Sequence, residues 1–407
     1  MVDGADIAEQ FEKHLNSPKQ TWLLGAGVSF PSNIPLMYPL TTRALEIANV
    51  EEFANDEDAK RIIKFIQDDV AEGAHIEELL THLADLISMA ERSRSGGVTM
   101  NGTHVSKAKL VSVHIALLRI IAEIVRWGYR PPISDSKGKV TQEALIGAKG
   151  KSIVTIDGHQ EFVQAIFGTG RAGLESFRTP VEFFTTNYDT LLEDALALLQ
   201  IDYQDGFTGG GVGFWGLRNY SPRDGTRALV TKLHGSIDWY RPKVSPSPVL
   251  RVRDGDSYPG EGGAVMIYPQ ATKYMNTQRD PFAEIFQRFR HRLAHGIDHV
   301  LLICGYSFGD DHINAEIEIA MATPKSQLTI IAFADEPGGQ MPKTLEDWRK
   351  NRAWRQQVFI ASPKGLYQGS AGPQFPAASG PRDWWTFAGA TRLLRDGLPK
   401  DIQESIQ

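Results

Sequence analysis

The chain has 407 residues, of which 42% are hydrophobic and 23% are charged, as in an ordinary globular protein. Its formal net charge of −6 argues against a general nucleic-acid coat or a membrane-surface protein, so we expect neither direct nucleic-acid binding nor a membrane partner. The single cysteine, Cys304, excludes internal disulfides and multi-cysteine zinc sites and indicates a soluble protein of a reducing, cytoplasmic compartment.

The first part of the chain predicts a short strand that ends in glycines. Residues 5–15 suit a helix, and residues 21–24 a buried strand. Gly25-Ala26-Gly27-Val28-Ser29 follows at once, and glycines in such a place let the backbone approach a pyrophosphate. A tight turn with nothing bound is the alternative.

A helical insertion follows this first strand. From about residue 51 to residue 127 apolar side chains recur at helix spacing on three faces, with a loop expected over 93–103. Charges within residues 108–127 indicate an amphipathic helix and not a membrane span. We therefore assign residues 51–150 to a helical insertion, and residues 1–50 and 151–407 to one α/β domain.

The rest of the chain alternates strands with helices. This pattern predicts a Rossmann-like, doubly wound parallel sheet. The expected strands cover residues 181–184, 228–233, 299–305, 328–333 and 358–360, and the expected helices 191–199, 281–294, 311–321 and 384–394. Loops are expected over residues 128–158, 204–225, 243–263 and 362–381.

Polar or glycine-rich clusters follow four of the strands, at Gly25, Thr185, His234 and Gly305. Carboxyl ends of parallel strands share one edge of a sheet, so we expect these clusters to converge on one pocket. A histidine at such an edge can act as a general base near neutral pH, although a lone histidine is more often structural.

Simpler interpretations stand beside several of these residues. Asn187 and Asp189 suit helix capping, as do Asp310 and Asp311, for which we keep that interpretation. Cys304 lies in an apolar run and is expected to be an inert core thiol.

Residues 211–216 fit the GxGxxG spacing of dinucleotide sites. We reject that match, because no strand precedes the segment and no helix follows it. A flexible loop, with Phe214 and Trp215 as a candidate lid, is the interpretation that we keep.

Together the four clusters resemble the sirtuin family in the same chain order. Residues 25–29 with Ile34-Pro35 look like its GAGxS…GIP loop, although Asn33 stands where the family usually has glycine. Residues 186–189 resemble its QNxD motif, residues 233–235 its LHG motif, and residues 305–307 its GTS segment.

The resemblance implies NAD as the substrate and assigns roles to the motif residues. Asn187 would position the ribose and the attacking water, Asp189 would meet the nicotinamide carboxamide, and His234 would be the general base. The residues implied in holding the rest of NAD are Gly25, Ala26, Gly27 and Ser29 at the pyrophosphate, Thr186 in the second motif, and Gly305 and Ser307 on the adenosine side.

Two differences from the protein-deacylating sirtuins change the activity that we expect. Protein-deacylating sirtuins carry a four-cysteine zinc ribbon, which this chain cannot build, so no metal is expected. A long helical insertion between the first and second motifs resembles that of the sirtuin-like effectors of bacterial anti-phage defence, which hydrolyse NAD. Among them, a stand-alone chain of this size is similar to the partner of a HerA-type ATPase.

The resemblance therefore implies an NAD glycohydrolase that depletes cellular NAD. The alternatives are an NAD- or ADP-ribose-binding regulatory module without turnover, and an unusual protein deacylase. We expect a homo-oligomer in which an apolar face of the insertion packs against a second copy.

Overall fold

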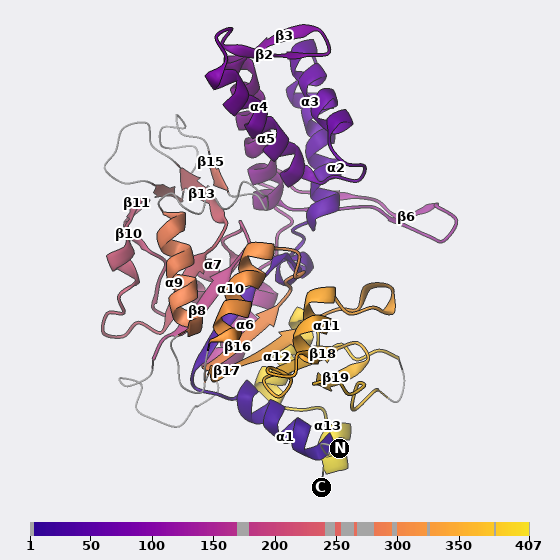
Figure 1. Cartoon of the computed structure of the whole chain (residues 1–407), viewed down its shortest axis with the longest axis vertical. Helices are drawn as coiled ribbons and strands as arrows, with labels where there is room; N and C mark the ends of the chain where they lie inside the picture. The colour runs from indigo at the N-terminus through magenta and orange to yellow at the C-terminus, as the bar shows by residue number, and fades with distance from the viewer. Residues whose placement is uncertain are drawn as a thin grey trace.

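The computed structural model describes residues 4–168, 179–240, 249–253, 264–266, 281–294, 299–323, 326–377 and 380–406. Its central sheet has eight strands in the order β19-β18-β17-β16-β1-β8-β12-β9 (Figure 1). All neighbours in this sheet run parallel except β18 and β19. In that order the strands are Gly365–Gln368, Val358–Ser362, Leu328–Phe333, His299–Cys304, Gln20–Leu24, Val181–Thr185, Ala228–Lys232 and Tyr203–Gln204.

Helices cover both faces of this sheet, and strand residues alternate between the two resulting cores. Trp22 and Leu24 of β1 join one core, and Leu23 between them joins the other. The first core is closed by α1 (Gly4–Leu15), α6 (Asp157–Phe167), α7 (Leu191–Leu198), α12 (Phe387–Asp396) and α13 (Lys400–Ile406). The second is closed by α9 (Phe282–Ala294), α10 (Asp311–Ala322) and α11 (Lys343–Lys350). This arrangement confirms the predicted doubly wound α/β fold.

The insertion is a helical bundle that stands on the sheet domain (Figure 1). Its three expected apolar faces bury against one another and against α2 in a third core, so its helices hold most of their apolar surface within the bundle. The bundle contains α2 (Met37–Ile47), α3 (Glu57–Asp69), α4 (Ile76–Arg92) and α5 (Lys107–Trp127). Among the described helices none is both long enough and apolar enough to cross a membrane.

Five predicted loops contain strands, namely 93–103, 128–158, 204–225, 243–263 and 362–381. The loop expected over 93–103 is mostly the hairpin of β2 (Gly97–Met100) and β3 (Thr103–Ser106). The stretch 204–225 contributes β10 (Phe207–Gly209) and β11 (Val212–Trp215) to a second, five-stranded sheet with β14 (Leu250–Val252), β13 (Gly235–Tyr240) and β15 (Ala264–Met266). The edge strand β19 lies within the loop expected over 362–381. Glycine-rich sequence concealed these strands, because glycine has low strand propensity.

The second sheet changes the prediction that Phe214 and Trp215 form a lid. Trp215 is buried in the core beneath β11, so its assignment to a lid is wrong, whereas Phe214 is exposed. The GxGxxG match at 211–216 is a strand of an antiparallel hairpin, which supports its rejection as a dinucleotide site. Much of the loop expected over 243–263 lies outside the described residues.

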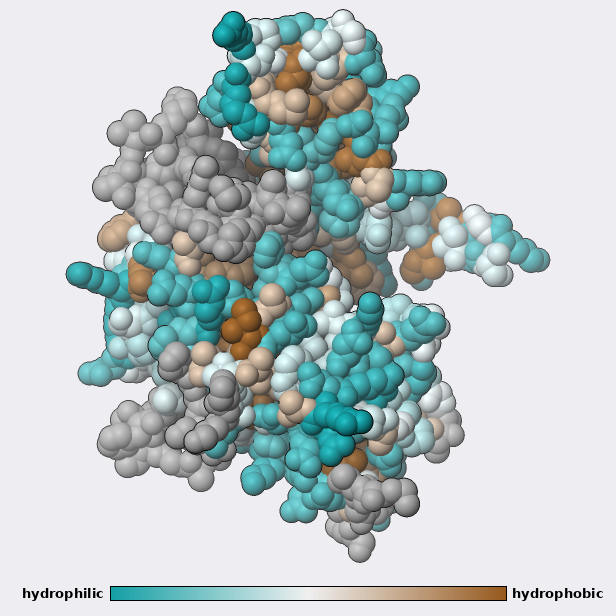
Figure 2. Space-filling model, in the orientation of Figure 1, coloured by the Kyte–Doolittle hydropathy of each residue, from teal (hydrophilic) through white to brown (hydrophobic). Residues whose placement is uncertain are grey.

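An exposed ribbon projects from the molecule between α5 and α6. We call residues 129–151 the arm. It consists of two short antiparallel ladders, β4 (Tyr129–Arg130) with β7 (Leu145–Ile146) and β5 (Ile133–Ser134) with β6 (Val140–Gln142). Figure 2 shows apolar as well as polar surface on this projection.

Candidate active site

The candidate site lies where the order of the sheet reverses. From β1 the chain adds β8 and then β12 on one side, and later β16, β17 and β18 on the other side. The reversal therefore falls between β16 and β1. Ligands of open α/β sheets bind beyond the strand ends at such a reversal. Gly25 follows β1 and Gly305 follows β16 at this point, as the sequence predicts.

The two glycine loops pack backbone against backbone. The Gly27 amide donates to the Gly305 carbonyl over 2.9 Å, and the Gly25 amide donates to the Cys304 carbonyl over 3.0 Å. A Cβ added at Gly27 would lie 2.7 Å from the Gly305 Cα, closer than real Cβ atoms approach. Gly305 also has a φ of +66°, which favours glycine. Glycine is therefore required here by packing within the protein, whatever it also offers to a phosphate.

Ser29, Asn187 and Asp189 form one buried hydrogen-bonded group. The Ser29 hydroxyl donates to Asp189 Oδ2 over 2.8 Å and accepts from Asn187 Nδ2 over 3.0 Å. Asp189 Oδ1 accepts from the Leu191 amide at the start of α7, although the N-cap residue of this helix is Thr190 and not Asp189. Asn187 Oδ1 is buried without any partner in the part of the chain that the structure describes.

A buried lysine holds the turn that carries these side chains. Lys232, at the end of β12, donates through Nζ to the main-chain carbonyls of Asn187, over 3.0 Å, and of Asp189. It also lies 3.5 Å from the carboxylate of Glu193. Burial raises the pKa of Glu193 to about 7, against the opposing effect of the Lys232 charge. Lys232 therefore fixes the backbone from which Asn187 and Asp189 project.

His234 is paired with a second buried carboxylate. Its Nε2 lies 3.0 Å from Asp310 Oδ2, and the two residues are 5% and 7% exposed. Asp310 Oδ1 meanwhile accepts from the His312 and Ile313 amides and caps α10. The capping interpretation of Asp310 is thus correct for one oxygen, while the other orients the imidazole.

The two clusters are neighbours. The rings of Tyr188 and His234 have centroids 6.5 Å apart, and the Ser236 hydroxyl donates to the Tyr188 carbonyl over 3.1 Å. The Ile237 amide donates to the same carbonyl. Because β13 starts directly after His234, it ties the histidine to the turn that holds Asn187.

The remaining predicted residues lie at the same edge, with different exposure. Ala26 and Ser307 are exposed, and Thr186 is half-buried with its amide bonded to the Leu24 carbonyl. Asn33 has a φ of +64°, a left-handed conformation that asparagine tolerates better than most residues, which explains why it can replace glycine.

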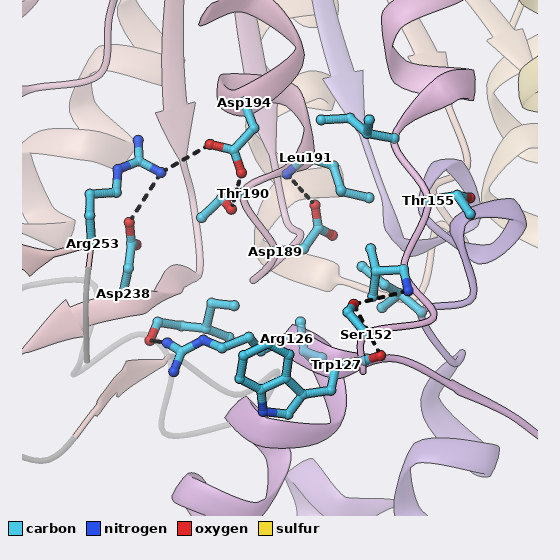
Figure 3. Close-up of a pocket in the computed structure, with 15 residues that line it drawn as sticks. Arg126, Trp127, Ser152, Thr155, Asp189, Thr190, Leu191, Asp194, Asp238 and Arg253 are labelled. Atoms are coloured by element: carbon cyan, nitrogen blue, oxygen red, sulfur yellow. Dashed lines mark hydrogen bonds and ion pairs between the residues drawn. The ribbon is translucent and has the colours of Figure 1, made fainter. Parts of the chain in front are cut away.

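A pocket of about 440 Å³ opens beside Asp189 (Figure 3). Its walls include Ile34 from the first loop and Arg126 and Trp127 from the end of α5, so the insertion contributes to it. On the opposite wall Arg253 lies 3.6 Å from Asp238, as Figure 3 shows. The pocket thus offers carboxylates, guanidinium groups and an aromatic side chain within reach of Asp189.

These groups suit acid–base chemistry on a polar organic ligand. A buried amide oxygen without a partner can accept a hydrogen bond from a hydroxyl or a water molecule, and the histidine–carboxylate pair can accept a proton. Among the described residues, no group of three or more His, Cys, Asp or Glu side chains is arranged to hold a metal ion.

A family profile agrees with the motif resemblance. Residues 181–354, which include Asn187, His234 and Asp310, match the sequence profile of the SIR2-like domain. The comparison with curated proteins found no match. Two solved structures align over most of both chains with a TM-score of 0.35. One is a Sir2 homologue in complex with NAD, with 12% identity over 100% of this chain and 96% of that chain. The other is a Sir2 variant with a deacetylated p53 peptide and 3′-O-acetyl ADP-ribose, with 11% identity over 96% and 99%.

Three residues of the site were not singled out in the sequence. Lys232 and Glu193 look like an ordinary strand end and helix surface, yet both are about 3% exposed. His159, on α6, is buried close enough to Asp189 to feel its charge, and burial lowers its pKa. A charged residue inside an otherwise apolar run, such as Lys232 between Val230 and Leu233, was the available signal.

Proposed function

We propose that the chain hydrolyses NAD at the nicotinamide–ribose bond and releases nicotinamide and ADP-ribose. The observation that carries the proposal is the buried, unpartnered Asn187 Oδ1, held beside Ser29 and Asp189 and next to the His234–Asp310 pair. An unsatisfied buried acceptor costs about 1–3 kcal/mol, which a bound hydroxyl or water would recover. The SIR2-like match over residues 181–354 supports NAD as the ligand.

The bond to be broken needs little help at the leaving group. Nicotinamide in NAD is a pyridinium, so it departs as a neutral molecule when it takes the bonding electron pair. The ribose carbon becomes oxocarbenium-like, and nearby carboxylates stabilise such a cation. Asp189, Asp194 and Asp238 line the pocket, and Asp189 is the one of these that shares the Ser29 hydroxyl with Asn187.

Water then completes the reaction. Asn187 Oδ1 accepts a hydrogen bond from the attacking water or from the ribose hydroxyl that positions it. His234 takes the proton that the water releases, and Asp310 stabilises the resulting imidazolium. The glycine loops and Ser307 are proposed to contact the pyrophosphate and the adenosine ribose.

Incubation of the purified protein with NAD, followed by chromatography of nicotinamide and ADP-ribose, tests the proposal. His234→Ala and Asn187→Ala should each lower turnover by about a hundredfold or more. His291→Ala, on α9, is the matched histidine control and should retain full activity. Normal turnover in His234→Ala would remove this residue from the mechanism.

The same incubation separates the alternatives. Intact NAD or ADP-ribose recovered from a stable complex, without turnover, would identify a binding module. Addition of an acylated peptide that yields acyl-ADP-ribose would identify a deacylase, and stoichiometric zinc would accompany the usual zinc ribbon of such enzymes. We expect neither acyl transfer nor zinc.

We further propose that the activity serves anti-phage defence by depleting cellular NAD, with a HerA-type ATPase as partner. This rests on the sirtuin-like motifs combined with the helical insertion. Cells that carry the pair should lose NAD after phage infection, and cells with the His234→Ala chain should not. Unchanged NAD in infected cells with the intact pair would contradict the role.

A further inference from the structure

The outer part of the arm is exposed, whereas Tyr129 at its base is buried. Every residue from 132 to 143 is exposed, so the ribbon buries almost nothing of its own. Its ladders pair only two or three residues each. An isolated two-stranded hairpin is at best marginally stable in water. A projecting ribbon of this kind gains stability when something packs against it.

Apolar side chains are concentrated on this ribbon. Ile133, Val140, Leu145 and Ile146 are each between 42% and 53% exposed. The helices of the insertion, by contrast, bury their apolar faces in their own core. The arm thus carries four exposed apolar side chains on a short ribbon, and exposed apolar surface of this kind marks interaction sites.

The charge of the arm identifies the kind of surface that it fits. Residues 129–151 contain five Lys or Arg and two Asp or Glu, a net charge of +3 in a chain of net charge −6. Residues 51–78 of the insertion contain ten Asp or Glu and three Lys or Arg, a net charge of −7. Arg43, Lys109 and Arg119 from outside this segment pair with three of the carboxylates, whereas Asp68 and Glu72 are exposed on it. The two segments are complementary in charge, and Figure 1 shows α3 and the arm on the same side of the molecule.

We propose that the arm of one copy docks on the acidic surface of residues 51–78 of a second copy, and the reverse. A reciprocal contact of this kind closes on itself as a two-fold dimer. The exposed apolar side chains supply the buried centre of the interface, and the lysines at the tip meet the carboxylates around it. The insertion thus serves assembly through its charge, and the apolar contact comes from the arm. Assembly is independent of NAD turnover.

Charge exchange tests the proposal on the full chain. Light scattering of the wild type should give a mass of at least twice 45.1 kDa. Lys137→Glu with Lys139→Glu should return the mass to that of the monomer, and so should Asp68→Lys with Glu72→Lys. A mixture of these two variants should recover the dimer, because opposite charges face each other again. Lys343→Glu with Lys400→Glu, on exposed helical positions elsewhere, is the control and should not dissociate.

Cross-linking locates the contact. Cys304 is buried and its pKa is raised to about 12 by burial, so a thiol reagent should label an introduced Ser136→Cys at the arm tip instead. A photo-cross-linker there should join residues 51–78 of an isotope-labelled second copy. A monomeric wild type, an oligomer that survives both charge reversals, or cross-links to co-purified nucleic acid in place of the second copy would each overturn the proposal.

Discussion

Asp310→Asn separates the two tasks of the Asp310 side chain. Oδ1 caps α10 by accepting from the His312 and Ile313 amides, and Oδ2 faces His234 Nε2. Asparagine retains one oxygen, and the cap requires that oxygen at the position of Oδ1. The amide nitrogen then faces Nε2, which must give up its proton. The ring proton moves to Nδ1, and the imidazole loses both its charge partner and its basic nitrogen.

The distance between the two groups sets the expected size of the effect. A unit-charge pair 3.0 Å apart interacts by about 5 kcal/mol at an effective dielectric constant of about 20. Because asparagine keeps a polar contact, we expect a loss of about 3 kcal/mol from the transition state, or about a hundredfold in turnover. Asp310→Ala should be as inactive and should also lose about 1 kcal/mol of stability with the cap.

Turnover of NAD and thermal melting of both variants measure these effects. Asp56→Asn is the matched control, since Asp56 caps α3 in the same way but lies in the insertion. It should leave turnover unchanged. Full activity in Asp310→Asn would show that His234 needs no carboxylate and would refute this account of the pair.

Two further predictions concern the support of the site. Glu193 has a pKa raised from 4.5 to about 7 in the folded protein, so the stability it contributes is present below about pH 4.5 and is lost as the pH rises through 7. The loss of unfolding free energy is about 3 kcal/mol. Glu193→Gln should remove this part of the pH dependence in melting experiments at pH 5 and pH 8, whereas the exposed Glu9→Gln should not. An equal change of melting temperature with pH in wild type and Glu193→Gln would contradict the burial argument. Gly27→Val should separate the loop from Gly305 and so abolish NAD binding in calorimetric titrations, while His234→Ala should bind NAD normally. Equal NAD affinities of the wild type and Gly27→Val would mean that the loop takes no part in binding.

Much of the sheet could be predicted because its strands are short apolar runs between clear breaks. Residues 299–305 and 328–333 are nearly continuous apolar runs, as expected for strands that are buried on both faces. The strands in 204–225 and at 365–368 could not be predicted, because glycine and proline neighbours gave the sequence the composition of a loop. Tertiary pairing, and not local propensity, makes these segments extended.

Some residues of the candidate site could likewise be predicted from the sequence, and others could not. Asn187, Asp189 and His234 could be found because each follows a recognisable strand. The pairing of His234 with Asp310 could not, because it joins residues 76 positions apart on different elements. Nor does the sequence indicate that Lys232 turns inward to two main-chain carbonyls, since lysine at a strand end is normally solvated.

The packing of the Gly25–Gly27 loop against Gly305 also determines when, during synthesis of the chain, the candidate site can form. The two partners are separated by 280 residues, the difference between positions 305 and 25. A ribosome adds roughly 5–20 residues per second, so the second loop leaves it roughly 15–60 s after the first. During that interval β16 is absent from the sheet. The boundary between β1 and β16, where the order of the strands reverses and the candidate site lies, has therefore not formed. A chain that ends before Gly305 would therefore lack the contact between the two loops on which the proposed NAD site depends.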